Sequence, residues 1–255
     1  MSEISRREFL AVTSSAVALA ALASEVNAAE SASGLGVGVA ASGTSFAANH
    51  DIKPLPFDVT KLDGISEKLM RSHWENNYSG SVKALNAVKQ KLAGFVDDAG
   101  LPAYIYNDLK REHLLRTGSV VLHELYFGNL GGSGKADSFV QKTLAEAFGS
   151  YEAWEKEFRR MGAGLGGGSG WVVLGLNLHS GLLENYWQWD HLHAPSSTLP
   201  LLVLDMYEHS YQMDYGAAAT NYVEAFFRNI HWETVTARLE KALKARVVWL
   251  TGGLR

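Results

Sequence analysis

The chain has 255 residues, a formal net charge of −4 and no cysteine. Its length suffices for one or two domains with a substantial core, and the acidic balance argues against a nucleic-acid-binding surface. The absence of cysteine excludes disulfides, thiolate zinc sites, cysteine-ligated iron–sulfur clusters and cysteine nucleophiles. Any metal must therefore be held by histidine and carboxylate side chains.

The first 28 residues have the features of an export signal. Residues 5–10 (SRREFL) form a twin-arginine pattern, an apolar stretch follows over 10–23, and residues 26–28 (VNA) offer a small-residue cleavage site. The apolar stretch is short for a membrane span, although a retained anchor is the alternative. We expect a periplasmic or otherwise exported protein without stable membrane insertion after signal removal. Residues 29–52, rich in Ala, Ser and Gly, are predicted to be a flexible linker.

The folded part is predicted to begin with two long helices. Apolar residues recur at helical spacing over 64–92 and again over 104–127. Ser79-Gly80 indicates a break or kink in the first helix, and residues 97–102 form a turn between the two. The pattern predicts an antiparallel helical hairpin domain over residues 53–132.

Residues 133–255 are predicted to form an α+β domain. The Gly-rich connector at 129–134 marks the boundary and lacks the Lys-Ser/Thr ending of a phosphate-binding loop. The elements expected after it are, in order, short helices over 139–148 and 153–161, strands at 171–174, 182–187 and 201–204, and helices up to about residue 250. We expect a three-stranded antiparallel sheet flanked by helices.

Asp205 and His209 lie four residues apart in an otherwise apolar run that follows the strand at 201–204. On a helix, positions i and i+4 share one face, so one Asp oxygen and one His nitrogen could converge on a metal ion. Buried Asp and His side chains need a strong reason to be there, and metal coordination is one. The alternative is an Asp that caps a helix N-terminus, followed by a hydrogen-bonded core histidine.

Two further histidines are candidates for the same site. His73 lies on the first predicted helix and His123 on the second, so the two can face each other across the hairpin. His123 has apolar neighbours, and a lone histidine in that setting is more typical of a satisfied core residue. Together with Asp205 and His209, however, the set offers three imidazoles and one carboxylate. That donor set suits Fe, Mn or Zn and leaves room for solvent.

Four segments carry a resemblance to a known family. They are residues 205–211 (DMYEHSY), 148–151 (FGSY) with 168–171 (GSGW), 123–127 (HELYF) and 81–86 (SVKALN). Over residues 53–245 the chain resembles the iron/manganese superoxide dismutases. The resemblance implies that one Fe or Mn ion per subunit is held by His73, His123, Asp205 and His209. It also implies that the chain converts superoxide to O2 and H2O2 by redox cycling of that ion.

The resemblance further implies roles around the metal. Gln188 is the candidate for the glutamine that binds the metal's solvent, although a solvent-facing residue of an edge strand is the alternative. Trp171 is expected to line the metal pocket, with ordinary strand core as the alternative. Ser81 stands at the substrate gate. Two histidines near this region, His191 and His193, either approach the substrate funnel or belong to a surface loop.

The resemblance also implies a homodimer and shows where this chain departs from its family. Glu208 is expected to reach His209 of the partner subunit, and Tyr211 is expected at the interface. Asn77 replaces the histidine to which an interface tyrosine is usually linked. The other departures are Ser81 in place of a gate tyrosine, with Tyr78 as a replacement phenol, Ser119 at the position of the iron-type glutamine, and Tyr207 in place of a tryptophan.

These departures keep two other functions open. One is a family-derived metal-binding protein without dismutase activity, and the other is a different metalloenzyme, such as a hydrolase or oxidase, that uses the same site. A di-iron helical bundle and a zinc peptidase are disfavoured because neither Glu-x-x-His nor His-Glu-x-x-His occurs in the chain. The choice between Fe and Mn stays open.

Overall fold

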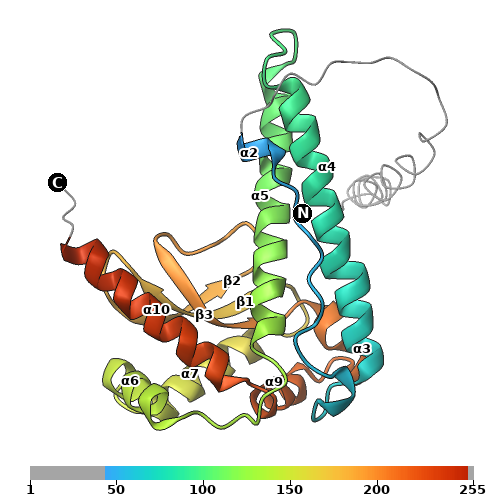
Figure 1. The fold of residues 1–255 in the computed structure, drawn as a ribbon. Helices are drawn as coiled ribbons and strands as arrows, with labels where there is room; N and C mark the ends of the chain where they lie inside the picture. Colours follow the sequence, from blue (N-terminus) through green and yellow to red (C-terminus); the bar gives the residue numbers. More distant parts are fainter. Residues whose placement is uncertain (1–43, 252–255) are drawn as a thin grey trace, which may run out of the picture. The chain divides into compact units, whose positions relative to one another are not determined.

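The computed structural model describes residues 44–251 (Figure 1). The predicted signal segment and residues 29–43 of the predicted linker lie outside the described residues. The two predicted domains share one hydrophobic core and belong to a single compact unit. The predicted boundary near residue 133 therefore does not separate two independently packed domains. Within the described range, no helix combines the length and the apolar character needed to cross a membrane.

The predicted helical hairpin is confirmed (Figure 1). After a short turn, η1 (Val59–Lys61), its elements are α3 (Glu67–Ser72), the π-helical segment η2 (His73–Tyr78), α4 (Ser79–Phe95) and α5 (Ala103–Gly128). Ser66 begins α3, because its side chain accepts a hydrogen bond from the backbone N–H of Leu69. The first helix is not broken at Ser79-Gly80. It widens instead into the π-helical turns of η2, a feature that is frequent at functional sites.

Part of the predicted flexible linker is ordered on the hairpin. It contains helix α2 (Thr44–Ala47), and the following chain is bonded to α4. The N–H of His50 donates to Asn86 Oδ1 at 2.9 Å, and Asn86 Nδ2 donates to the carbonyl of His50 at 3.0 Å. The linker prediction is therefore wrong for residues 44–52. Composition alone does not reveal a segment that is held through backbone hydrogen bonds to another element's side chains.

The α+β half is also confirmed. Its elements are α6 (Ser138–Phe148), α7 (Tyr151–Gly164), β1 (Trp171–Asn177), β2 (Leu183–Gln188), β3 (Thr198–Asp205), η3 (Glu208–Ser210), α8 (Gln212–Tyr215), α9 (Ala219–Arg228) and α10 (Trp232–Thr251). The sheet is antiparallel with the order β2-β1-β3. Figure 1 shows it between the hairpin and α10, with α5 in contact with β3.

The register of the sheet sets the position of the site. Trp171, the first residue of β1, lies opposite Asp205 on one side and Gln188 on the other. Residues directly opposite each other in an antiparallel sheet project from the same face. The side chains of Trp171 and Asp205 are therefore neighbours at the end of the sheet where β3 stops.

Asn129, at the end of α5, joins the hairpin to the second half, and its replacement by alanine should destabilise the protein. Its fully buried amide donates to the carbonyls of Tyr126 and Val203, and its Oδ1 accepts from Arg238 Nη1 at 2.9 Å. Asn129→Ala leaves these groups unpaired, so we expect the free energy of unfolding in urea to fall by about 2–4 kcal/mol. The matched control is Asn221→Ala, at an exposed position of α9. Equal stabilities of the two variants would contradict the joining role.

Candidate metal centre

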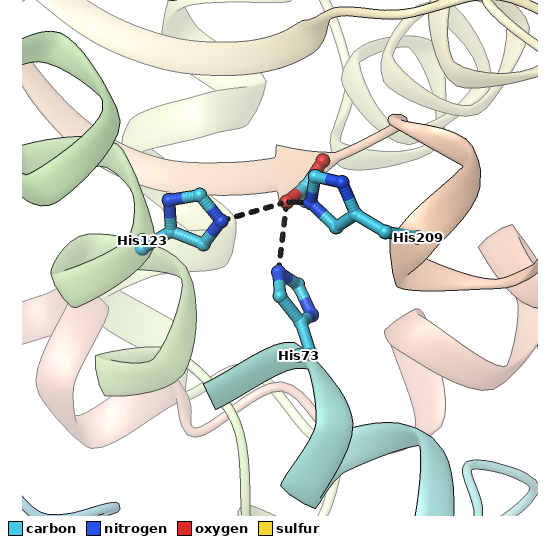
Figure 2. Close-up of side chains that lie close together, drawn as sticks. His73, His123 and His209 are labelled. Carbon is cyan, nitrogen blue, oxygen red and sulfur yellow. Dashed lines mark hydrogen bonds and ion pairs between the residues drawn. The ribbon is translucent and has the colours of Figure 1, made fainter. Parts of the chain in front are cut away.

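Four side chains from four different elements converge at one point (Figure 2). They are His73 at the start of η2, His123 in α5, Asp205 at the end of β3, and His209 in η3. One nitrogen or oxygen atom from each lies within 4.8 Å of the others. Asp205 Oδ2 is 3.1 Å from His73 Nε2, 3.2 Å from His209 Nε2 and 3.7 Å from His123 Nε2. The structure thus brings together the four residues that the sequence predicts as ligands.

Asp205 and His209 do not share a helix face, contrary to the sequence prediction. Asp205 is the last residue of a strand, and His209 lies in the short 3-10 turn that follows. The turn brings the two together because Asp205 Oδ1 accepts a hydrogen bond from the N–H of Tyr207 at 2.9 Å. This Asx-type bond fixes the carboxylate with Oδ2 directed at the histidines.

The hydrogen bonding of the site indicates that it is built for a cation. His123 Nδ1 donates to the carbonyl of Ser119 at 2.7 Å, which leaves a lone pair on Nε2. That nitrogen is buried and has no hydrogen-bond partner among the described residues, and the same holds for both ring nitrogens of His73. Lone pairs that face a carboxylate oxygen repel it, and unpaired buried polar atoms need an explanation. A metal ion among these atoms supplies it, and the nitrogen and oxygen donors suit Fe, Mn or Zn.

The protonation states fit a metal-binding role. Burial lowers the pKa of His73, and burial lowers the pKa of His123 to about 3. Burial alone would raise the pKa of Asp205, but the nearby imidazoles of His209 and His73 hold that pKa below its ordinary value. Near neutral pH His73 and His123 are neutral and the carboxylate is charged, which is the state that a metal ligand requires.

Acid should destabilise the metal-free protein. An unfolded histidine has a pKa of about 6.5, whereas that of His123 in the fold is about 3. Between these values the unfolded chain binds a proton that the folded chain does not, so stability falls as the pH drops through this range. The lowered pKa of Asp205 acts in the same direction at lower pH. We expect the unfolding free energy, measured in urea, to be about 2 kcal/mol lower at pH 5 than at pH 7 from His123 alone. A flat or rising profile would contradict this assignment of protonation states.

Trp171 and His191 form one wall of the site. Trp171 is fully buried, and its ring meets the ring of His123 edge-on, with centroids 5.1 Å apart. Its Nε1–H donates to Nδ1 of His191 at 3.1 Å. The predicted position of Trp171 at the metal pocket is therefore supported by contacts and not by burial alone. Because His191 accepts at Nδ1, its own proton lies on Nε2 when the ring is neutral.

His191 is the functional candidate that sequence reasoning left undecided. Its ring stacks on Tyr207 at 4.7 Å between centroids and lies 5.9 Å from the ring of His123. Burial lowers its pKa to about 4, so the ring is neutral near neutral pH. His193, two residues later, is exposed and lies beside Asp190. No periodic pattern separates the two histidines in the sequence, since both follow β2 in an irregular loop.

Gln188 ends β2 opposite Trp171, and its role as the glutamine that binds the metal's solvent stays a prediction. The side chain is 2% exposed, which excludes the solvent-facing alternative. Its Oε1 is buried without a hydrogen-bond partner among the described residues, and the residue lines a cavity beside Gly118 and Leu122. His191, three residues further on, lies beside the ring of His123 and accepts the hydrogen bond from the Trp171 indole.

Ser81 reaches the ligands through a second serine. Its Oγ lies 2.8 Å from Ser119 Oγ, which in turn lies 3.3 Å from His123 Nδ1. Tyr78 is not a replacement for a gate phenol. Its hydroxyl accepts from the N–H of Lys53 and donates to Glu124, both at 3.0 Å, and burial raises its pKa to about 12. The small hydroxyls of the two serines therefore occupy this side of the site.

Tyr211 is a core residue of the single chain. It is 1% exposed, its ring stacks on Tyr222, and its hydroxyl accepts from the N–H of Gly167 at 3.0 Å. This contradicts its predicted place at a subunit interface, because a side chain enclosed by its own chain has no surface to offer. Glu208, by contrast, is exposed next to the ligand His209. It stays available for the predicted contact with a second subunit.

The fold and the donor set define a mononuclear metalloprotein whose ion lies between a helical hairpin and the end of a three-stranded sheet. Residues 136–238 match the family described as iron/manganese superoxide dismutases, C-terminal domain. A superoxide dismutase [Fe] of Cupriavidus metallidurans is 49% identical over 195 residues, which cover 76% of this chain and 98% of the relative. A superoxide dismutase [Fe] of Aquifex aeolicus is 37% identical (72% and 88% covered), and a superoxide dismutase [Mn] of Haloferax volcanii is 33% identical (77% and 98% covered). The chain belongs to the iron/manganese superoxide dismutase family.

Proposed function

We propose that the protein is a superoxide dismutase that converts two superoxide anions and two protons into O2 and H2O2. The observation that carries the proposal is the convergence of three histidine nitrogens on one buried carboxylate oxygen. The names of the relatives support iron or manganese as the metal, and both occur among them. We propose one Fe or Mn ion per subunit.

The ion would be held by His73, His123, Asp205 and His209, and when bound it would supply the one-electron redox change of each half-reaction. The protein's own contribution is electrostatic. One carboxylate charge and neutral imidazoles favour a positive ion. The apolar ring of Trp171 covers one side of the site and restricts access of water there.

His191 is proposed as the group that orients a small molecule beside the ligands. The Trp171 indole fixes its tautomer by occupying Nδ1, so Nε2–H is the donor that remains. Burial lowers the pKa of His191 to about 4, so the ring is neutral near neutral pH. His191 therefore donates a hydrogen bond without adding a positive charge to the site. Such outer partners tune both the potential of a metal and the affinity for its exchangeable ligand.

The decay of superoxide after pulse radiolysis tests the proposed function. The protein is reconstituted separately with Fe and with Mn, and its metal content is measured on the same samples. We expect catalysed decay with a second-order constant approaching about 10⁸ M⁻¹s⁻¹ for the correct metal, near the diffusional range. Full metal occupancy with no acceleration over buffer would reject the dismutase proposal in favour of a metal-binding protein without this activity.

We also propose export through the twin-arginine route to the periplasm. The supporting observation is the arginine pair at Arg6 and Arg7 ahead of an apolar stretch and a small-residue cleavage site. Fractionation of cells that express the full chain should place the shortened protein in the periplasm, and Arg6→Lys with Arg7→Lys should retain it in the cytoplasm. Unchanged distribution of the double variant would contradict this route.

A homodimer is proposed in which Glu208 contacts His209 of the partner subunit. Its support is the exposure of Glu208 next to a metal ligand that is itself partly exposed. Light scattering should show a dimer whose dissociation constant rises in Glu208→Ala, while the matched variant Glu224→Ala, at an exposed position of α9, should not change it. A monomer at all concentrations would reject the contact.

A further inference from the structure

A cavity of about 190 Å³ lies outside the metal centre, between α5 and the sheet. Its walls are mostly apolar and include Val121, Leu122, Val173, Ala194, Pro195 and Pro200. The side chain of Val121 is 45% exposed, whereas Leu122 and Val173 are buried, so the cavity opens to solvent beside Val121. An apolar protein cavity of about 150 Å³ is large enough to bind benzene.

The cavity wall is fixed by close backbone packing. The loop that follows β2 lies so near α5 that a Cβ atom on Gly118 would come within 1.9 Å of the carbonyl oxygen of His191. Two prolines on the same wall restrict the backbone further. The space is therefore preformed, and a ligand that enters it need not first order the surrounding chain.

Three polar side chains interrupt this apolar lining, those of Gln188, His191 and Thr198. His191 and Thr198 have hydrogen-bond partners, in Trp171 and Ser196, whereas the oxygen of the Gln188 amide has none among the described residues. The amide of Gln188 is 2% exposed and makes no side-chain hydrogen bond with any described residue, and its Oε1 is buried without a donor. An unpaired buried polar atom lowers the stability of the fold, so a partner for it is favourable. The amide of Gln188 makes no hydrogen bond with any of the four ligand residues, so its oxygen is free to accept one from a molecule in the cavity. A ligand with a hydroxyl group satisfies the amide, because a hydroxyl both donates and accepts.

We propose that this cavity is a binding site for a small uncharged molecule with an apolar body and one hydroxyl group, held through the amide of Gln188. A phenol or a short branched alcohol has this chemistry. The lining includes none of the four ligand residues, and it shares only His191 with the proposed dismutase site. Failure of either proposal leaves the other standing.

Calorimetric titration of the metal-loaded full chain with phenol and with toluene tests the proposal. The two probes have nearly the same shape, but only phenol carries the hydroxyl. We expect phenol to bind more tightly than toluene by roughly five- to tenfold, the value of one hydrogen bond to a buried amide. In Gln188→Met, which keeps the length and removes the amide, this preference should vanish while toluene binding persists.

Matched tryptophan variants locate the site. Val121→Trp blocks the mouth and should weaken the binding of both probes at least tenfold. Leu114→Trp, seven residues earlier on α5 and also exposed, should leave both affinities within twofold of the parent protein. Equal affinities for the two probes in the parent protein would overturn the proposal, as would unchanged binding in Val121→Trp. No binding of either probe would overturn it too.

Discussion

Asp205→Asn should yield a folded protein that does not retain its metal. The carboxylate is the only anionic donor of the set, and its Oδ2 lies within 3.7 Å of a nitrogen from each of the three histidines. Loss of an outer partner alone weakens metal binding about 10–100-fold. Loss of the charged ligand itself should therefore weaken binding at least about 100-fold. Elemental analysis of the purified protein should then show well under one ion per chain.

The asparagine variant suits this test because it preserves the local fold. The amide oxygen of Asn keeps the acceptor for the N–H of Tyr207, so the turn that positions His209 is retained. The matched control is Asp190→Asn, whose carboxylate bonds to the exposed His193 on a nearby loop. That variant should retain the metal content of the parent protein. Full metal occupancy in Asp205→Asn, with a normal circular dichroism spectrum, would refute the ligand assignment.

His191→Leu should lower dismutase activity by about 10–100-fold while the metal content stays that of the parent protein. The change removes the Nε2–H donor and leaves the Trp171 indole N–H without its acceptor. It replaces none of the four ligands. The measurement is kcat/KM from superoxide decay, normalised to bound metal, together with the midpoint potential of the bound ion.

Two companion variants separate a positioning role from a purely structural one. His193→Leu removes a histidine from the same loop, and because His193 lies on the surface it should leave activity and potential unchanged. His191→Gln restores an uncharged hydrogen-bond donor and should recover part of the activity and shift the potential back. If His191→Leu lowers only thermal stability, and leaves the potential and the activity per metal ion intact, the orienting role proposed for His191 is wrong.

The ligands were predictable because each is constrained by a pattern. His73 and His123 occupy facing helices of a hairpin, and their helical spacing is visible in the sequence. Asp205 and His209 were expected on one helix face, which is wrong, although their convergence holds. A strand end followed by a tight turn brings residues four apart together as well as a helix does, and the sequence does not distinguish these two geometries.

The surroundings of the ligands were less predictable, because they depend on how a loop folds back. Gln188 and His191 are three residues apart, and only the path of the chain after β2 decides that His191 bonds to the Trp171 indole. Tyr211 was expected at an interface from family resemblance, but burial of its ring on Tyr222 is a packing outcome without a local signal. Long-range contacts of single side chains leave no periodicity that a sequence analysis can detect.

The four ligands are divided between the two halves of the folded chain, with two on the hairpin, one at the end of β3 and one in the turn that follows it. An ion held by all four therefore acts as a cross-link between segments that are remote in sequence, in the way that a disulfide constrains the unfolded chain. The free energy of metal binding then contributes directly to the free energy of folding. The amount of folded protein in a cell should rise with the supply of its metal, so that metal scarcity would limit the abundance of the protein as well as its activity.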